Sequence, residues 1–181
     1  MWPHAIVGDL DSAPTALVDE AVERSIAVTR HPADKNDTDL ALALDDAVVA
    51  GASVITVVAA FGGRLDHELA TIGLLAAGRW SHVAMSATDG RRSMWIVHDQ
   101  VDLSLPIGQT VSLVPWAGDV TGVRTKGMQW PLQGEPLESG STRGVSNVTS
   151  DPAQSVSVTG GVLLVVVDRK PEASLERAQV G

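Results

Sequence analysis

The segment Ser53-Val54-Ile55-Thr56-Val57-Val58-Ala59-Ala60 is nearly continuous in apolar and β-branched residues. Such a run predicts a strand that is buried on both faces of a parallel sheet. Two glycines follow it, and apolar side chains then recur at helical spacing over residues 65–77, with Gly78 beyond the end. In that helix, the expected apolar face carries Leu65, Leu69, Ile72 and Ala76.

Upstream of this strand, short apolar segments alternate with helical patterns. The expected elements are strands at 5–7 and 26–28 and helices at 14–25 and 38–50. Asp37 or Thr38 suits the N-cap of the second helix, and Gly51 suits its end. This βαβα order predicts the fold class α/β, with a layered α/β nucleotide-binding domain over residues 1–100.

Downstream, the pattern changes. Asp89-Gly90 lies between two apolar runs and is a signal for a hairpin turn. Short strand candidates separated by Gly, Pro and Ser then follow at 110–114, 155–159 and 162–167, the last two joined across Gly160-Gly161. We expect a small antiparallel β-sandwich or barrel over residues 101–181.

The composition excludes several classes of protein. The net charge of −9 repels nucleic-acid phosphates, and no basic cluster in the sequence offsets it. The chain has no cysteine, which excludes disulfides, thiolate nucleophiles and cysteine-based zinc sites. No apolar run reaches the roughly 20 residues of a membrane span, and residues 1–4 lack the features of a signal peptide. We therefore expect a cytoplasmic protein.

Aromatic residues are scarce, with one Phe, no Tyr and five Trp. The core must therefore be built mainly from aliphatic side chains. Each Trp has enough apolar area to serve either as a core residue or as a binding platform.

A first polar cluster, Gly8-Asp9-Leu10-Asp11-Ser12, follows the strand expected at 5–7. Two carboxylates spaced i, i+2 after a strand can face one cation, and Mg²⁺ usually takes one or two carboxylates plus phosphates and waters. Asp is also common in turns, so a solvated turn before a capped helix explains the same residues. Taken alone, the cluster leaves both interpretations open.

A second cluster, Lys35-Asn36-Asp37-Thr38-Asp39, opens the helix expected at 38–50. A helix N-terminus offers free N–H groups and positive potential, which suit a phosphate. In this interpretation Lys35 neutralises phosphate charge and Asp39 supplies a third metal ligand. An ordinary capped helix start with a surface lysine is the alternative.

The third cluster, Gly62-Gly63-Arg64-Leu65-Asp66-His67, joins the buried strand to the next helix. Paired glycines let the backbone approach a ligand closely, and an Arg side chain can bind two phosphate oxygens at once. This form favours a phosphate-binding loop over a simple tight turn.

All three clusters are expected at the carboxyl edge of one sheet, where ligands bind in open α/β folds. Together they predict a Mg²⁺–nucleotide site for phosphoryl chemistry. The sequence contains none of the common alternatives G-x-x-x-x-G-K-[ST], G-x-G-x-x-G or H-E-x-x-H.

In this order, the three clusters resemble the motifs of the thiamine pyrophosphokinase family, G-D-[FL]-D-S, K-D-x-T-D and G-G-R-x-D-H. A fourth family motif, G-[LV]-S-N, is matched by Gly144-Val145-Ser146-Asn147. Asn36 replaces a residue that is usually acidic in the family. The A-D-G-G-like strand segment that precedes the first motif in the family has no counterpart in this sequence.

The resemblance implies transfer of a diphosphate group from ATP to the hydroxyl of thiamine, giving thiamine diphosphate and AMP. It implies Mg²⁺ as cofactor, ATP as co-substrate and a homodimer whose cleft lies between the α/β domain of one subunit and the β domain of the other. The implied site residues are Asp9, Asp11 and Asp39 for Mg²⁺ and catalysis, Asp66 for catalysis, Ser12, Lys35, Thr38, Arg64 and His67 for ATP, and Ser146 and Asn147 for thiamine.

Other functions fit the same residues. One is a diphosphokinase for another primary alcohol, and another is a non-catalytic relative that binds nucleotide or thiamine without turnover. We expect no nucleic-acid or membrane partner.

Overall fold

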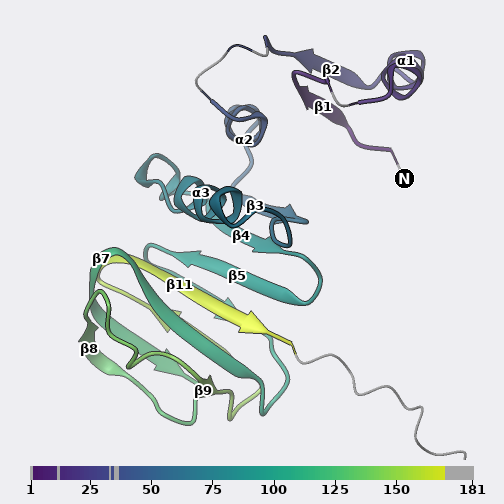
Figure 1. Ribbon diagram of the computed structural model, residues 1–181. Helices are drawn as coiled ribbons and strands as arrows, with labels where there is room; N and C mark the ends of the chain where they lie inside the picture. Colours follow the sequence, from purple (N-terminus) through teal and green to yellow (C-terminus); the bar gives the residue numbers. More distant parts are fainter. Residues whose placement is uncertain (1, 12, 33, 35–36, 170–181) are drawn as a thin grey trace, which may run out of the picture. The chain divides into compact units, whose positions relative to one another are not determined.

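The computed structural model describes residues 2–11, 13–32, 34 and 37–169. The chain divides into two compact units, Met1–Ser53 and Val54–Gly181 (Figure 1). In the described residues, no helix is long and apolar enough to cross a membrane.

The first unit is a βαβ arrangement followed by one more helix. Its elements are β1 (Ala5–Gly8), α1 (Thr15–Glu23), β2 (Ala27–Arg30) and α2 (Asp39–Val49). The two strands pair in parallel, with Ala5 opposite Ala27. Helix α1 follows Pro14, whose fixed φ suits a helix start, and α2 is capped by Thr38. The element order expected for this region is confirmed.

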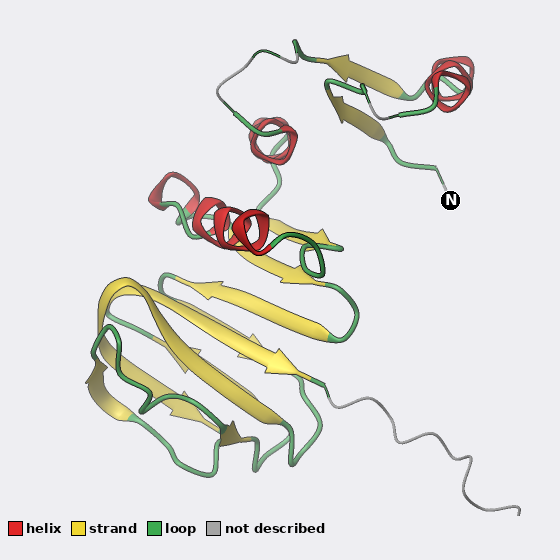
Figure 2. Ribbon diagram, viewed as in Figure 1, coloured by secondary structure: helices red, strands yellow, loops and turns green. Residues whose placement is uncertain are grey.

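The second unit is rich in strands and contains few helical residues (Figure 2). Its elements are β3 (Val54–Val58), α3 (Leu65–Leu75), the 3₁₀ turn η1 (Gly78–Trp80), β4 (Ala84–Thr88), β5 (Arg92–Val97), β6 (Gln100–Leu103), β7 (Thr110–Lys126), β8 (Gln133–Leu137), β9 (Asn147–Val148), β10 (Gln154–Ser157) and β11 (Gly160–Asp168). The strands form one sheet in the order β3-β4-β5-β11-β7-β10-β6, with β8 and β9 paired to β7. The sheet continues across residue 100, because β5 pairs with both β4 and β11.

Strand β3 differs from the expected strand with two buried faces. It lies at the edge of its sheet and pairs in parallel with β4. Because side chains alternate along a strand, Val54 and Val58 project from the same face, and there they are 70% and 72% exposed. The apolar face expected for the next helix is also only partly right, since Leu65 and Leu69 are exposed and Leu75 is the buried residue of α3.

The hairpin expected around Asp89-Gly90 is confirmed. Strands β4 and β5 are antiparallel, and Thr88 lies opposite Ser93. Asp89 Oδ1 accepts the backbone N–H groups of Arg91 at 2.9 Å and Arg92 at 2.6 Å. Gly90, with φ of 90°, takes the left-handed position that the turn requires.

The long strand β7 curls the sheet into a half-barrel. Its first part pairs with β11 and β9, and its last part pairs with β10 and β8. The bend between them contains Ala117 and Gly122, both with positive φ. Strands β10 and β11 are consecutive, but each pairs with β7 rather than with the other, so the Gly160-Gly161 connection does not form a hairpin.

An aliphatic core fills the curled sheet, as the composition predicts. Its buried members are Val97, Leu103, Leu105, Val111, Leu113, Val120, Val123, Met128, Leu137, Val156, Val158, Leu163, Val165 and Val167. Trp80 is a buried residue, whereas Trp130 is largely exposed. Trp80 is therefore a core residue, whereas a binding role for Trp130 stays a prediction.

Candidate active site

The loop after β1 lies against the first turn of α2. Gly8 ends the strand, and a Cβ added to it would lie 3.0 Å from Asp39 Oδ2. Leu10 has φ of 60°, and Asp9 Oδ1 accepts the backbone N–H of Asp11 at 3.2 Å. The structure therefore brings the Asp39 carboxylate to the end of the strand from which Asp9 and Asp11 follow.

Helix α2 begins with an ordinary N-cap. Thr38 Oγ1 accepts the Ala41 N–H at 3.3 Å, and the carboxylate of Asp39 lies in the first turn, where negative charge is favoured. A role of Thr38 in ATP binding stays a prediction. Ser12 and Lys35, also predicted to bind ATP, lie outside the described residues.

Asp9, Asp11 and Asp39 supply the carboxylate oxygens that Mg²⁺ prefers. Within the part of the chain that the structure describes, no three His, Cys, Asp or Glu side chains gather into a metal-binding group. Mg²⁺ commonly binds one or two carboxylates together with the phosphates of a substrate. The donor types fit Mg²⁺, and the role of these three carboxylates in binding it stays a prediction.

The G-G-R-L-D-H loop at 62–67 joins β3 to α3 in the second unit. Arg64 is the N-cap residue of α3, and its Nε and Nη2 atoms bind Asp66 Oδ1 at 3.1 Å and Oδ2 at 2.6 Å. The Arg64 guanidinium, with help from the backbone N–H of His67, holds the pKa of the Asp66 carboxyl below its ordinary value. A phosphate that binds Arg64 must therefore share this guanidinium with Asp66.

Two residues that the sequence reasoning missed lie beside the loop. Glu68 Oε1 accepts the backbone N–H of Gly62 at 2.5 Å, and Glu68 Oε2 lies 3.8 Å from Arg92 Nη1. The Arg92 guanidinium also stacks over the ring of Phe61, 5.1 Å from its centroid. The Asp89-Gly90 signal predicts the turn before Arg92, but it does not predict that Arg92 contacts residues beside the G-G-R-L-D-H loop.

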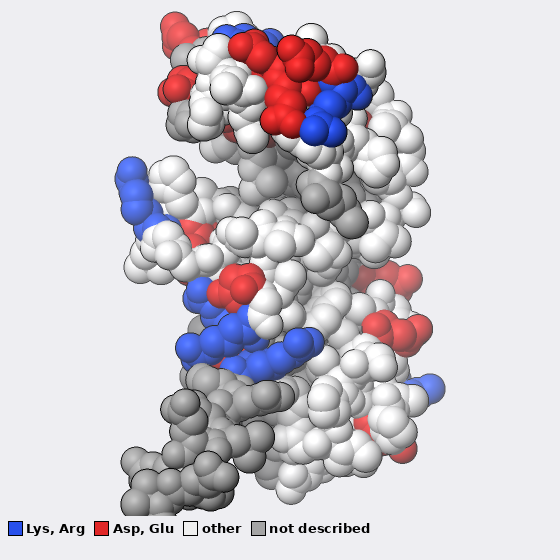
Figure 3. Space-filling model, turned by 90° about the vertical axis from the view of Figure 1, so that its right-hand side faces the viewer, with Lys and Arg blue, Asp and Glu red and all other residues white. Residues whose placement is uncertain are grey.

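Basic side chains form a band on the face of the second unit shown in Figure 3. The arginines that follow the Asp89-Gly90 turn are paired with acids. Arg91 Nε lies 2.9 Å from Asp168 Oδ1, and Arg92 Nε lies 2.8 Å from Asp89 Oδ2. The pairing reduces the net positive charge that these arginines present to solvent.

Ser146 and Asn147 line a cavity of about 420 Å³ in the curled part of the sheet. Its other lining residues are Leu113, Trp130, Pro131, Leu132, Arg143, Gly144 and Val145. We call this cavity the Trp130 pocket. A side chain at Gly144 would collide with the Leu113 carbonyl oxygen, which explains why a glycine occupies the first position of the G-V-S-N motif.

Asn147 connects the two sides of the Trp130 pocket. Its Oδ1 accepts the N–H groups of Trp130 at 3.1 Å and Val148 at 2.8 Å, and its Nδ2 donates to the Trp130 carbonyl at 2.7 Å. The side chain of Asn147 is buried, whereas that of Trp130 is 56% exposed. The buried amide thus fixes the backbone that presents an exposed indole, a contact that the sequence reasoning did not predict.

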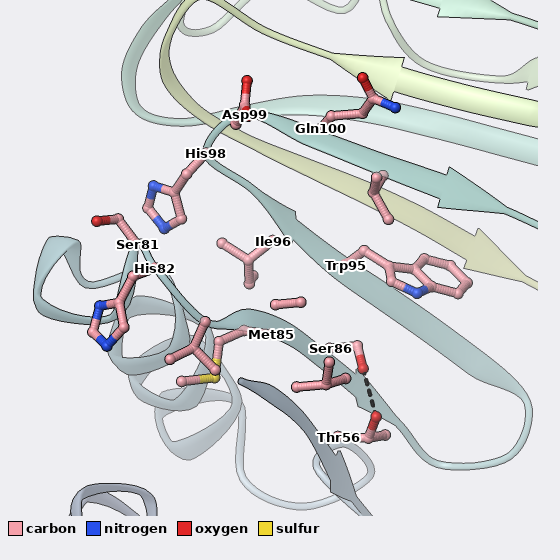
Figure 4. Close-up of a pocket in the computed structure, with 14 residues that line it drawn as sticks. Thr56, Ser81, His82, Met85, Ser86, Trp95, Ile96, His98, Asp99 and Gln100 are labelled. Atoms are coloured by element: carbon pink, nitrogen blue, oxygen red, sulfur yellow. Dashed lines mark hydrogen bonds between the residues drawn. The ribbon is translucent and has the colours of Figure 1, made fainter. Parts of the chain in front are cut away.

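A separate cavity of about 390 Å³ lies beside β4 and β5, and none of the predicted site residues lines it. Figure 4 shows His82 and His98 toward one end, and Thr56 and Ser86 joined by a 2.8 Å hydrogen bond toward the other. Burial lowers the pKa of His98. This cavity is not part of the predicted ATP or thiamine site.

Models of two protein domains match the sequence, one after the other. Residues 1–85 match "Thiamin pyrophosphokinase, catalytic domain", and residues 98–163 match "Thiamin pyrophosphokinase, vitamin B1 binding domain". A thiamine pyrophosphokinase of Bacillus subtilis (strain 168) is 26% identical over 166 residues, which cover 91% of this chain and 78% of the relative.

Solved structures show the same fold. A thiamine pyrophosphokinase from Bacillus subtilis aligns with a TM-score of 0.80 at 25% identity, covering 93% of this chain and 80% of the other. A thiamin pyrophosphokinase from Geobacillus thermodenitrificans aligns with a TM-score of 0.77 at 26% identity, and the alignment covers 95% of this chain and 79% of the other. Because both domains of the family match in order, over residues 1–85 and 98–163, and the fold is shared over 93% of this chain, the chain belongs to the thiamine pyrophosphokinase family.

Proposed function

We propose that this chain is a thiamine diphosphokinase, which transfers a diphosphate group from ATP to the hydroxyl of thiamine and releases AMP. One observation carries the proposal: every residue that lines the Trp130 pocket falls within residues 98–163, which match the vitamin B1 binding domain. The loops at 8–11 and 62–67 fall within residues 1–85, which match the catalytic domain. We assign residues 1–100 to a layered α/β, ATP-binding domain and residues 101–181 to a thiamine-binding domain.

In the reaction, the hydroxyl oxygen of thiamine forms a bond to the β-phosphorus of ATP. The bond between that phosphorus and the oxygen that bridges to the α-phosphorus breaks, and AMP leaves with the bridging oxygen. The hydroxyl proton is released. The protein's main contribution to such a transfer is to position the reactants and to neutralise charge on the phosphates.

The polar loops supply these contributions. Asp9, Asp11 and Asp39 would hold Mg²⁺, which would neutralise charge on the phosphates of ATP. Asp66, kept ionised by Arg64, holds that guanidinium at the start of α3, where helix N–H groups also favour phosphate. The assigned residues are Asp9, Asp11 and Asp39 for Mg²⁺, Asp66 for catalysis, and Ser12, Lys35, Thr38, Arg64 and His67 for ATP.

Thiamine binds in the Trp130 pocket. The exposed indole of Trp130 offers an aromatic face to the cationic thiazolium ring, an arrangement that attracts a cation electrostatically. Ser146 and Asn147 line the same pocket. We assign both residues to contacts with the substrate. Asn147 already makes three hydrogen bonds to backbone, so its remaining amide N–H is the donor available to thiamine.

The assay is AMP formation from ATP by the purified chain. We expect AMP only when thiamine and Mg²⁺ are both present, and equal amounts of AMP and thiamine diphosphate. Other primary alcohols are supplied in parallel reactions. If the folded protein releases no AMP with thiamine, or releases it equally with unrelated alcohols, the proposal is wrong.

We also propose a cytoplasmic homodimer in which the Trp130 pocket of one subunit faces the polar loops of the other. Mixing Asp11→Asn and Asn147→Ala subunits then builds one intact site in each mixed dimer. Activity recovered on mixing, with a dimer mass in sedimentation, is the expected result. If each site lies within one subunit, mixing restores nothing.

A further inference from the structure

Glu68 lies in the first turn of α3, and its side chain reaches back to the loop that precedes the helix. Its Oε1 accepts the N–H of Gly62 at 2.5 Å. Gly62 has φ of 104°, a conformation that favours glycine, and Glu68 is only 19% exposed. A charged acceptor therefore holds the backbone of the loop at a glycine with a left-handed conformation.

Arg92 connects this carboxylate to the β4–β5 hairpin. Its Nη1 lies 3.8 Å from Glu68 Oε2, and its Nε binds Asp89 Oδ2 at 2.8 Å. Its guanidinium also lies over the ring of Phe61, the residue before Gly62. The loop is thus held from two sides, at Gly62 by Glu68 and at Phe61 by Arg92.

We propose that Glu68 and Arg92 are positioning residues that hold the G-G-R loop in the conformation that receives the phosphates of ATP. This inference rests on the proposed function of the loop. The N–H group that Glu68 uses belongs to Gly62, before the helix, whereas the phosphate-attracting N–H groups are those of the first turn of α3. Because the Glu68 carboxylate bonds to the Gly62 N–H, it holds the loop through an N–H group outside the first turn of α3. The Arg64 side chain does not cap that turn either.

A carboxylate on a loop N–H has a second interpretation, in which it occupies the place of the phosphate and competes with it. The two interpretations predict opposite results. If Glu68 steadies the loop, its removal weakens ATP binding. If Glu68 competes, its removal strengthens ATP binding.

The first measurement is the Gly62 amide in nuclear magnetic resonance spectra of the ¹⁵N-labelled chain. In Glu68→Ala, we expect an upfield shift of the Gly62 amide proton and hydrogen exchange about tenfold faster, because a hydrogen bond to a charged acceptor is lost. Glu68→Gln retains an acceptor and should restore part of both signals. An unchanged Gly62 amide in Glu68→Ala overturns the proposal.

The second measurement is steady-state kinetics with Arg92→Met and both Glu68 variants. We expect the KM for Mg·ATP to rise about tenfold while the KM for thiamine stays the same, with Glu68→Gln affected least. Arg91→Met is the matched control, since it breaks the neighbouring pair with Asp168 and leaves the loop contacts in place. A lower KM for Mg·ATP in Glu68→Ala, or an equal change in Arg91→Met, overturns the positioning role.

The two measurements separate this inference from the proposed function. The amide signals require no turnover, so they test the contact even in a chain that releases no AMP. Mg·ATP binding by calorimetry then replaces the KM, and the same weakening is expected in Glu68→Ala and Arg92→Met. Unchanged Mg·ATP affinity in both variants overturns the inference.

Discussion

The G-G-R-L-D-H loop and the Trp130 pocket belong to the same unit, but different forces hold them. The pair of Arg64 and Asp66 in the loop is 74% and 62% exposed. In the pocket, Asn147 is buried and bonded to backbone on both sides. Exposed ion pairs add little stability, whereas a buried polar group that loses its partner is costly. We therefore expect loop variants to lose activity without unfolding, and pocket variants to lose both activity and stability.

The largest effect is expected for Asp11→Asn, in the exposed loop after β1. Loss of a carboxylate at the proposed Mg²⁺–phosphate site should lower AMP formation by about 10²-fold or more, while the melting temperature stays the same. AMP release and differential scanning calorimetry measure the two quantities. Asp46→Asn, an exposed change on α2, is the control and should retain full activity. Full turnover in Asp11→Asn would contradict its metal role.

Asn147→Ala tests the Trp130 pocket, the second region of the comparison. Removing the amide leaves the N–H and carbonyl groups of Trp130 without their partner, so we expect a loss of about 2–3 kcal/mol in the free energy of unfolding. The KM for thiamine should rise, and the KM for Mg·ATP should not. Urea unfolding and steady-state kinetics measure these effects. If Asn147→Ala is as stable as the unmodified chain, the pocket is not held as we describe.

Arg64→Met should weaken ATP binding and leave stability unchanged. We expect a rise of roughly tenfold in the KM for Mg·ATP, because the guanidinium that we propose as a phosphate ligand is lost. Arg24→Met breaks a comparable exposed pair with Glu20 on α1 and should change neither quantity. A fall in melting temperature specific to Arg64→Met would show that the loop, like the pocket, contributes to the fold.

The smallest effect concerns the ionisation of Asp66. Its pKa in the folded protein is lowered mainly by Arg64, so the very small stabilisation that this exposed pair adds is fully present above the ordinary pKa of an Asp. This contribution is lost as the pH falls through the folded-state value. In Arg64→Met, carboxyl titration by nuclear magnetic resonance should show the pKa of Asp66 rising toward its ordinary value. Asp89, whose pKa is lowered chiefly by the backbone N–H of Arg92, should titrate as before.

Local patterns predicted much of the secondary structure. Helix α2 begins at its Thr38 cap, and the D-G signal marks the turn between β4 and β5, because both features depend on neighbouring residues. The expectation for β3 was wrong in one respect, since an apolar run does not show whether both faces are covered. The Gly160-Gly161 connection was also misleading, because strand pairing depends on partners distant in sequence.

The candidate site also combines features that depend on neighbouring residues with contacts between residues distant in sequence. The motifs named Arg64, Asp66, Ser146 and Asn147 as functional residues, and these roles stay predictions. The motifs did not reveal that Glu68 and Arg92 meet at the G-G-R loop, because Arg92 reaches it from a separate hairpin. They also gave no sign that Asn147 binds the backbone of Trp130.

The sequence by itself indicated the family, the order of the helices and strands up to the β4–β5 hairpin, and residue types suited to phosphoryl transfer, since these depend on short motifs and local periodicity. Only the tertiary structure decided which side chains hold those motifs in place. The curl of β7 folds one sheet around an aliphatic core, and the β4–β5 hairpin brings Arg92 beside Phe61. Such contacts depend on the pairing of distant strands, which no local pattern specifies.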